Sequence, residues 1–573
     1  MNPFRETIVS DPWGAPVDVS EIHADVFEEC LRGLEHVRRF GQSAALLIHG
    51  AAGSGKTHLL SRLRGRLTLQ APTATDREES LFVWVRLQAS PRMIWRHVRR
   101  TLVEDWFRPV RGQRTQFERI LFHRLAAIRV AEGDLEPWYE FMREEHPQDL
   151  DALLDRVADA QHLDRNTTLA FKHLAFDRHR RDLRAWLAGD SLPEEALSRL
   201  GLSPLEGTDE EREDEARRVV IMLCRLAGDT LPILLSFDQV EALQATVDDR
   251  EGLFAFGQLV SALHDETHNL LIVACVQSAF ATELKDRLRG AHYDRLTSLG
   301  TRSLATLTRA QAERLIAARL LDPKYAAAGL PSPRDPLWPL ENQDFDRLAG
   351  YGELTPRRLL AACAERYDAW TAGTVGTAVA QPSVAQWLRQ EWTERLKRCR
   401  AENDPERTED IVRHGLPLLM RLLAPSVKLV RDELLPDVHL VFEGPPGRIG
   451  ISLCTQANLT SLAATLRHLK SQWSQQRLQR LLILRDERTP ISPRAKACRQ
   501  HLAELEQLGA VVVHCSAEVL GELDAFRQLL SDARSGDLDL QGETISAAAV
   551  EEWLPNHASI PLREWISSIC PIA

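Results

Sequence analysis

The sequence lacks a long apolar run. In 573 residues no stretch approaches the roughly 20 apolar residues that a helix needs to cross a bilayer. Residues 1–6 contain neither a basic segment nor an apolar segment of the kind that begins a secretory signal. We therefore expect no membrane-spanning helix, no export and a cytoplasmic location.

Closely spaced cysteine pairs are also missing. The nine cysteines are scattered along the chain without a CxxC pair, and several, such as Cys275, stand inside apolar runs. Structural zinc sites and disulfide frameworks need paired cysteines at short spacings. The pattern predicts buried free thiols in a reducing compartment.

The charge balance contains no excess of basic residues. The formal net charge of −11 argues against a protein covered by a nucleic-acid-binding surface, although binding depends on the local field. Basic clusters at 96–100, 178–181 and 395–400 keep a local contact with DNA open, and the solvated face of a helix is the alternative reading of each. The length predicts about three domains.

The most informative motif is Gly-Ala-Ala-Gly-Ser-Gly-Lys-Thr at residues 50–57, a complete GxxxxGK[ST] phosphate-binding loop. An apolar run at 44–48 predicts a strand before it, and residues 58–63 predict a helix after it. Glycines allow the backbone to curl so that successive N–H groups point at phosphate oxygens, and the start of the helix favours an anion.

This motif predicts a bound nucleoside triphosphate with Mg²⁺. Lys56 would reach the β- and γ-phosphates, and the hydroxyl of Thr57 would bind the metal. The predicted nucleotide-binding residues of the loop and the start of the helix are Gly50, Gly53, Ser54, Gly55, Lys56, Thr57 and His58. No motif distinguishes ATP from GTP.

Further buried strands are predicted at 81–87, 231–237 and 270–276, separated by helices. Between about 91 and 229 the pattern is helical without a convincing strand, so a large helical insert is expected. Helices at 308–321, 343–349 and 357–371 follow. Strands near 438–443, 448–454, 480–485 and 510–515 alternate with helices near 457–476, 492–508 and 517–533, which predicts a second, smaller α/β unit. Residues 540–573 predict two or three short helices.

An acidic residue ends the third buried strand. Asp238 follows an apolar run, so its carboxylate is expected beside the loop, where it can hold Mg²⁺. The next residue is Gln239, whose amide can orient a water molecule but cannot take a proton from it near neutral pH. Glu241 would share a face with Gln239 if the strand continued. Either Glu241 is the base, or hydrolysis is slow and the protein is a nucleotide-gated switch.

Two polar residues lie beyond the fourth strand. Gln277 follows that strand directly, so its amide is a candidate sensor of the γ-phosphate, with an exposed strand-end glutamine as the alternative. Arg295 is a candidate for an arginine that reaches the nucleotide of a neighbouring subunit, with an ordinary surface arginine as the alternative.

With these motifs, and with Gly352 and Glu353 preceding a Pro-Arg-Arg-Leu-Leu run at 356–360, the chain resembles the AAA+ and STAND group of ATPases. Origin-recognition-like and bacterial conflict-associated ATPases are the nearest in character. The resemblance implies that Arg357 is a nucleotide-sensing arginine of a helical lid. It covers residues 15 to about 370 outside the insert, and Gln239 departs from the usual catalytic glutamate.

The expected fold class is α/β. A P-loop NTPase core would occupy residues 1–305 with its helical insert at about 91–229, a helical lid residues 306–375, and a C-terminal α/β interaction domain residues 376–573. The last of these resembles a degenerate restriction-endonuclease-like domain, because Pro436, Asp437 and Glu443 are suggestive of nucleases of the PD-(D/E)xK type. Residues 448–454 contain no acid or lysine with which to hold Mg²⁺ and water.

The function expected from these observations is that of an ATP-binding, AAA+/STAND-like ATPase that switches with its nucleotide. Its cofactors would be ATP and Mg²⁺. The resemblance implies a homo-oligomer with a protein client in a bacterial antiviral defence or DNA-transaction system, with DNA as a further candidate partner and no membrane partner. Two alternatives stay open: a DNA-binding loader or regulator of the origin-recognition kind, and an ATP-dependent nuclease subunit.

Overall fold

The computed structural model describes residues 2–5, 12–14, 16–68, 80–87, 93–110, 114–128, 135–205, 207–243, 251–324, 335–350, 354–372, 383–401, 405–430, 435, 437–445, 447–455, 459–473, 478–493, 495–534, 536, 538–540 and 543–570. Gly352, Glu353 and Pro436 of the predicted motifs lie outside these residues. The chain forms two compact units. Unit 1 comprises Met1–Asp164, Arg217–Gln381 and Ser535–Thr544, and unit 2 comprises Arg165–Ala216, Pro382–Arg534 and Ile545–Ala573.

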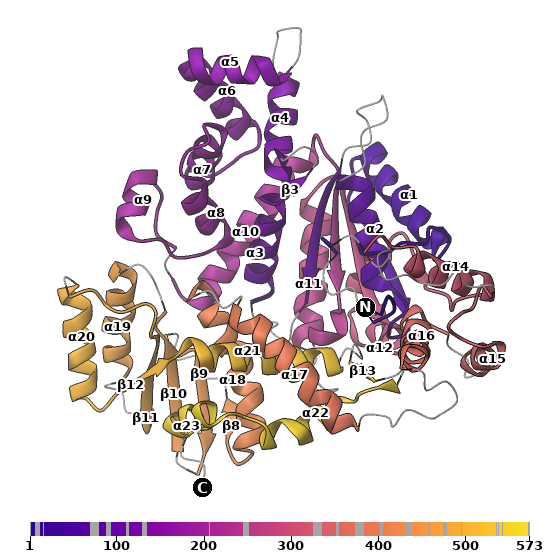
Figure 1. The fold of residues 1–573 in the computed structure, drawn as a ribbon. Coiled ribbons are helices and arrows are strands. Elements are labelled where there is room, and N and C mark those ends of the chain that lie inside the picture. The colour runs from indigo at the N-terminus through magenta and orange to yellow at the C-terminus, as the bar shows by residue number, and fades with distance from the viewer. Residues whose placement is uncertain are drawn as a thin grey trace. The chain divides into compact units, whose positions relative to one another are not determined.

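A parallel five-stranded sheet lies at the centre of unit 1, with the strand order β2-β5-β6-β1-β7 (Figure 1). The strands are β1 (Ala44–Gly50), β2 (Leu81–Arg86), β5 (Ile233–Asp238), β6 (Leu270–Gln277) and β7 (Thr301–Ser303). The first four confirm the predicted buried strands, because continuous apolar runs are typical of strands that are covered on both faces. The short, polar β7 was not predicted. The mixed α/β class is confirmed.

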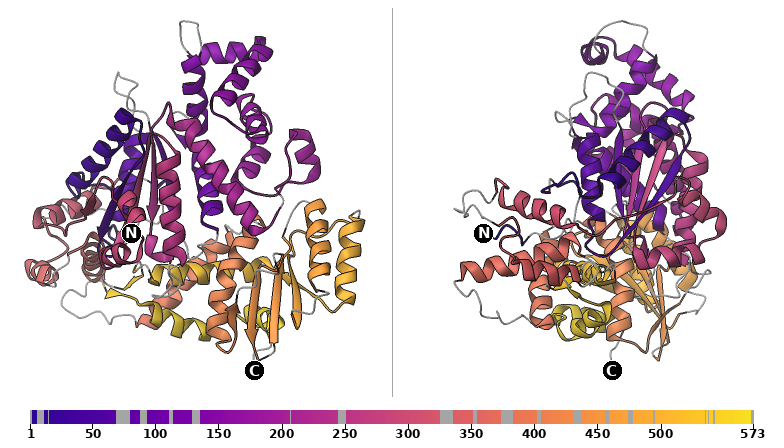
Figure 2. Two further views of the ribbon diagram at one scale, coloured as in Figure 1. Left: turned by 180° about the vertical axis from the view of Figure 1, so that it is seen from behind. Right: turned by 90° about the vertical axis from the view of Figure 1, so that its right-hand side faces the viewer.

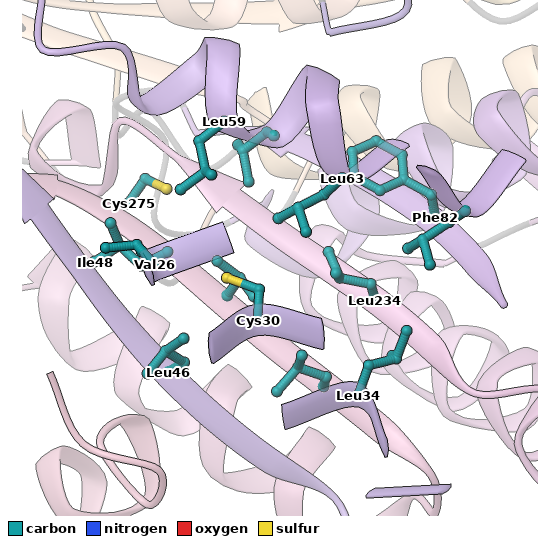
Figure 3. Packing of buried hydrophobic residues seen from close by; sticks show 14 of the residues in the cluster. Val26, Cys30, Leu34, Leu46, Ile48, Leu59, Leu63, Phe82, Leu234 and Cys275 are labelled. Carbon is teal, nitrogen blue, oxygen red and sulfur yellow. The ribbon is translucent and has the colours of Figure 1, made fainter. Parts of the chain in front are cut away.

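Helices cover both faces of this sheet, as seen in Figure 1 and from behind in Figure 2. On one face α1 (Ala24–Phe40) and α2 (Lys56–Thr68) pack on the strands, and Figure 3 shows this core. Side chains from the two helices interleave with those of the strands in one apolar cluster, which includes Val26, Cys30, Leu34, Leu59, Leu63, Leu46, Ile48, Phe82, Leu234 and Cys275. On the other face lie α3 (Ile94–Trp106), α11 (Glu251–Glu266) and α13 (Gly290–Leu296).

In its described residues the predicted insert contains helices and one short hairpin. Its further helices are α4 (Gln116–Ile128), α5 (Leu135–Glu145), α6 (Pro147–Ala160), α7 (Arg165–Ala175), α8 (Arg180–Ala188), α9 (Glu194–Leu200) and α10 (Asp209–Gly228). The prediction that this region has no strand was wrong for β3 (Pro109–Val110) and β4 (Arg114–Thr115). Strands of two residues are too short to show an alternating pattern in the sequence.

Helices predicted after β6 are confirmed, and two of them have defined caps. They are α14 (Arg309–Leu320), α15 (Asn342–Gly350) and α16 (Pro356–Thr371), whereas α12 (Ser278–Arg287) was not predicted. Thr308 and Gln311 form a capping box at the start of α14, and the hydroxyl of Thr355 accepts a hydrogen bond from the N–H of Arg358 in α16. These bonds satisfy backbone donors that would otherwise be unpaired at a helix start. Thr355 and Pro356 therefore fix where α16 begins, and with it the position of Arg357.

Unit 2 contains a second, mixed five-stranded sheet with the order β12-β11-β10-β9-β8. Its strands are β8 (Lys428–Val430), β9 (Leu440–Gly444), β10 (Gly447–Leu453), β11 (Arg480–Asp486) and β12 (Val511–Cys515). The first three pair antiparallel and the last three pair parallel. The crossovers are α19 (Leu459–Trp473) and α20 (Lys496–Gln507), and α21 (Ala517–Arg534) follows β12. Only β8 was not predicted.

The other elements of the C-terminal region are helices and one hairpin. They are α17 (Val384–Ala401), η5 (Pro405–Arg407), α18 (Thr408–Leu423), β13 (Asp539–Leu540), β14 (Glu543–Thr544), α22 (Ala547–Trp553), η6 (Leu554–Asn556) and α23 (Ile560–Ile569). The short helices predicted near the end are α22, η6 and α23.

The two units do not follow the predicted domain boundaries in two places. Residues 165–216 of the insert belong to the unit that contains the second sheet, and Ser535–Thr544 belongs to the unit that contains the first. All nine cysteines are buried and free, as predicted. Among the described residues, no helix is both long and apolar enough to cross a membrane.

Candidate functional site

The predicted site residues of the first sheet come together because its strands are parallel. Gly50, Asp238 and Gln277 are the last residues of β1, β5 and β6, and the carboxyl ends of parallel strands lie at one edge of the sheet. Strand β6 lies between β1 and β5 in the sheet. Gly50 of β1 pairs in register with Gln277 of β6. This edge is the place where ligands bind in open α/β sheets.

The loop from Gly50 to Thr57 has the tight backbone that its glycines predict. A Cβ atom on Gly50 would lie 2.5 Å from the Oγ of Ser54, so no side chain fits there. Gly53 and Gly55 have φ values of +73° and +100°, which side chains disfavour. Lys56 extends back over the loop, where its Nζ donates to the carbonyls of Gly50 (3.0 Å) and Ala51 (3.2 Å).

Thr57 and Asp238 are in direct contact, although they are far apart in the sequence. The hydroxyl of Thr57 donates a hydrogen bond of 2.7 Å to Oδ2 of Asp238. Asp238 is only 2% exposed. Mg²⁺ in proteins is commonly bound by one or two oxygen ligands of the protein together with phosphate oxygens and water. The hydroxyl of Thr57 and the carboxylate of Asp238 are two such oxygen ligands, and they lie next to each other. The residues present therefore fit this cation.

Gln239 has an unusual backbone and a defined partner. Its φ is +60°, a left-handed conformation that is uncommon for residues other than glycine. Arg86, the last residue of β2, donates from Nε to the side-chain oxygen of Gln239 at 2.8 Å. Register places Arg86 opposite Asp238, so the guanidinium lies beside the residue that follows Asp238.

The strand-alternation argument for Glu241 does not hold. Strand β5 ends at Asp238, and residues Val240–Leu243 form a 3₁₀ helix, η3. The left-handed backbone of Gln239 and the 3₁₀ helix end the extended conformation before Glu241, so the two side chains do not share a strand face.

Arg357 lies against the Gly50–Thr57 loop. Its backbone N–H donates to the carbonyl of Gly53 at 3.4 Å, and a Cβ on Gly53 would lie 2.6 Å from the Cβ of Arg357. Arg357 is 8% exposed and belongs to the first turn of α16. The structure thus brings the lid arginine to the loop across about three hundred residues of sequence.

Arg295, by contrast, has a local partner in the described structure. Its guanidinium forms two contacts with the carboxylate of Asp265, at 2.9 Å from Nε and 2.7 Å from Nη2. Arg295 lies on α13, whereas Asp265 lies near the end of α11. The ion pair holds this side chain in a defined direction and raises the pKa of Arg295.

Three residues at the site were not predicted from the sequence. One is Arg86, and the others are His23 and Asp18. Nε2 of His23 donates to the carbonyl of Ser54 at 2.8 Å, and burial lowers the pKa of His23. The carboxylate of Asp18 contacts Nε2 of His58 at 2.9 Å. No motif marks His23 or Asp18, because their role depends on the path of the N-terminal segment over the loop.

In unit 2 the nuclease-like residues are placed as follows. Asp437 lies 3.8 Å from Nδ1 of His468, and Glu443 lies on β9 opposite Arg448 of β10. Strand β10 presents Ser452, whose hydroxyl donates to the backbone carbonyl of Asp437 at 2.8 Å. The described residues of β10 include no carboxylate or lysine.

A second group of possible metal ligands lies in the same unit. Asp209, Glu409 and His439 each offer a ligand atom, and these atoms lie within 4.8 Å of one another. Arg413 donates to both carboxylates, at 3.2 Å to Asp209 and 2.7 Å to Glu409. Nδ1 of His439 accepts a hydrogen bond from the N–H of Leu453. The guanidinium supplies the positive charge that a metal would bring, so this group is an internal ion cluster.

No family model matches the chain, and a search of curated proteins found no related sequence.

Proposed function

We propose that the chain binds a nucleoside triphosphate with Mg²⁺ at the Gly50–Thr57 loop and acts as an AAA+/STAND-like ATPase that switches with its nucleotide. The observation that carries the proposal is the 2.7 Å hydrogen bond from Thr57 to Asp238. The residues that the motif and the strand end single out independently are in contact, in the arrangement that two Mg²⁺ ligands require.

The surrounding residues support the proposal. The ammonium group of Lys56 lies over the loop, where it would bind the β- and γ-phosphates, and Arg357 lies against Gly53, from which its guanidinium would sense the γ-phosphate. The start of α2 contributes backbone N–H groups and a favourable dipole. Mg²⁺, when bound, would neutralise charge that develops on the phosphates during transfer. Thr57 and Asp238 would hold it.

Slow hydrolysis follows from the position after Asp238. Gln239 orients water but cannot accept its proton, and Arg86 holds the amide oxygen. We propose that the protein resides for long periods in its triphosphate-bound state and that assembly with copies of itself, or with a protein client, depends on that state.

The alternatives receive less support. A nuclease needs carboxylates that hold Mg²⁺, and the described residues of β10 include none. A DNA-binding loader needs an exposed basic surface that contacts DNA. In the basic cluster at 395–400, Arg395 is buried between two carboxylates, and in the cluster at 96–100, Arg99 is buried. Neither side chain is exposed for contact with DNA.

The proposal is tested by titration calorimetry with Mg²⁺ and either ATP or GTP. Lys56→Ala removes charge-assisted hydrogen bonds worth about 1.5–3 kcal/mol, so we expect its affinity to fall by about ten- to one-hundred-fold. The matched control is Lys285→Ala, an exposed lysine on α12 of the same unit, which should leave affinity unchanged. Equal affinities of Lys56→Ala and the unaltered protein would contradict the proposal.

A further inference from the structure

A short segment near the C-terminus belongs to the unit that contains the phosphate-binding loop. Ser535–Thr544 clusters with the first sheet, whereas the helices before and after it, α21 and α22, belong to unit 2. The chain therefore leaves unit 2 after α21, joins unit 1 for these few residues and returns to unit 2 before α22. Its described part contains the hairpin of β13 and β14, and we call the whole segment the strap.

Gly536 is the residue of the strap that reaches the candidate nucleotide site. Its carbonyl accepts a hydrogen bond of 3.1 Å from Nη1 of Arg357. A Cβ on Gly536 would lie 3.2 Å from the Cβ of Ala52 and 3.2 Å from Nε2 of Gln277. The strap thus touches the loop, the end of β6 and the lid arginine at one point.

The packing of the strap is specific rather than incidental. Gly536 is buried and has a φ of +65°, so both its conformation and its surroundings favour glycine. Leu538, two residues further on, is only 2% exposed. Burial of this apolar side chain favours the docked position of the strap.

The hydrogen bond between Arg357 and Gly536 links the strap to nucleotide binding, because both would use the same guanidinium. A γ-phosphate carries acceptor oxygens with negative charge, so its attraction for the cationic guanidinium of Arg357 exceeds that of a neutral carbonyl. The carbonyl of Gly536 is itself an acceptor, so it does not attract a phosphate oxygen placed beside it. A triphosphate therefore competes with Gly536 for the guanidinium of Arg357, and a diphosphate, which lacks the γ-phosphate, does not.

We propose that the strap is the nucleotide-responsive element of this protein: Arg357 holds Gly536 in the presence of a diphosphate, and a triphosphate takes Arg357 and weakens the docking of the strap. This inference rests on the proposed function. Along the sequence the strap lies between α21, which ends at Arg534, and α22, which begins at Ala547. By linkage, docking of the strap and binding of triphosphate oppose each other by the same free energy.

Hydrogen exchange measured by mass spectrometry tests the proposal on the full-length protein. Exchange of backbone amides in residues 536–544 is compared for the protein alone, with Mg²⁺–ADP and with Mg²⁺ and the non-hydrolysable analogue adenosine 5′-(β,γ-imido)triphosphate. We expect faster exchange with the triphosphate analogue only. Calorimetry on the same samples establishes that each nucleotide binds. Binding of both nucleotides with unchanged or slower exchange would overturn the strap alone, whereas no binding would overturn the proposed function and the strap with it.

A pair of glycine variants separates docking of the strap from backbone strain. Gly536→Ala places a Cβ against Ala52 and Gln277, whereas Gly41→Ala introduces the same strain at a φ of +66° with no atom within 4 Å. We expect Gly536→Ala, and not Gly41→Ala, to speed exchange in the strap without nucleotide. Gly536→Ala should also raise affinity for the triphosphate analogue by about five-fold or more while affinity for ADP stays the same. Identical behaviour of the two variants would contradict the proposal.

Discussion

The guanidinium of Arg86 donates from Nε to the side-chain oxygen of Gln239 across 2.8 Å. Arg86 is the last residue of β2, and Gln239 directly follows β5, the neighbouring parallel strand, so the pairing of the two strands brings these residues together. It fixes the orientation of the amide directly after Asp238, at the position from which a side chain faces the attacking water in the proposed site. The contact also determines what a carboxylate at position 239 would meet.

We predict that Gln239→Glu alone raises the rate of ATP hydrolysis by less than about ten-fold. A well-placed general base contributes roughly 10²- to 10⁴-fold. Here the new carboxylate would pair with Arg86, and a nearby opposite charge lowers the pKa of a carboxylate and so weakens it as a base. Combining Gln239→Glu with Arg86→Gln should add at least another factor of about ten. Steady-state phosphate release under saturating Mg²⁺–ATP measures both rates.

The control for this pair is Arg86→Gln in the otherwise unaltered protein. Without a carboxylate at position 239, loss of the arginine supplies no base, so the rate should not rise. A single Gln239→Glu variant as fast as the double variant would show that Arg86 does not restrain this position.

Much of the first sheet and of the candidate site could be predicted from the sequence because the signals there are local. A continuous apolar run predicts a strand covered on both faces, and a glycine-rich motif between strand and helix predicts a tight loop. Asp238 and Gln277 were predicted because each directly follows such a run. Parallel pairing then brings the strand ends together, which is how Thr57 and Asp238 come into contact.

The remaining features depend on tertiary structure. Arg86 becomes informative only once β2 is known to lie beside β5. Gly536 stands in a stretch with no motif, and its carbonyl meets Arg357 only because the chain returns to the first unit. Glu241 was interpreted by strand alternation, which fails because a left-handed residue ends the strand at a point that the sequence does not mark.

Arg295 is predicted to act on the nucleotide of a neighbouring copy. If so, Arg295→Ala should lower the hydrolysis rate by at least about ten-fold at concentrations where the protein self-associates, since arginines in this role contribute roughly 10³- to 10⁵-fold. Asp265→Asn removes the same local ion pair but keeps the arginine, and it should retain activity. Rates are measured over a range of protein concentrations by phosphate release. Equal losses in the two variants would indicate that the ion pair only stabilises α13 against α11.

We predict that the free energy of unfolding of unit 1 depends on pH through Asp105. Burial raises the pKa of Asp105 to about 7, and the carboxylate accepts a hydrogen bond of 2.8 Å from the N–H of Trp84. The unfolded chain ionises near pH 4, so between about pH 4 and 7 the folded state binds more protons and stability falls as pH rises. Asp105→Asn removes this penalty, which is at most about 4 kcal/mol. Its free energy of unfolding relative to the unaltered protein should increase from pH 4 to pH 8, as measured by denaturant titration. A difference independent of pH would contradict the assignment.

Two arginines on α17 give a matched comparison of a buried and an exposed ion pair. Both reach carboxylates on α21: Arg395 contacts Asp532 at 2.6 Å, and Arg400 contacts Glu518 at 2.7 Å. The side chain of Arg395 is 5% exposed and that of Arg400 is 42% exposed. Removing one partner of a buried pair leaves an uncompensated charge and typically costs about 3–5 kcal/mol, whereas an exposed pair contributes about 0–1 kcal/mol.

We therefore predict that Arg395→Ala lowers the free energy of unfolding of unit 2 by about 3 kcal/mol and that Arg400→Ala lowers it by less than about 1 kcal/mol. Urea unfolding followed by tryptophan fluorescence measures both, because Trp392 lies on the same helix and packs on Trp553 with ring centroids 6.3 Å apart. High salt should reduce the small effect of Arg400→Ala and leave the large one nearly unchanged, since a buried pair is screened far less than an exposed one. Similar losses in both variants, or a loss for Arg395→Ala that disappears at high salt, would contradict this prediction. Either result would mean that Asp532 becomes hydrated when Arg395 is removed, and that apolar contacts rather than the ion pair hold α17 against α21.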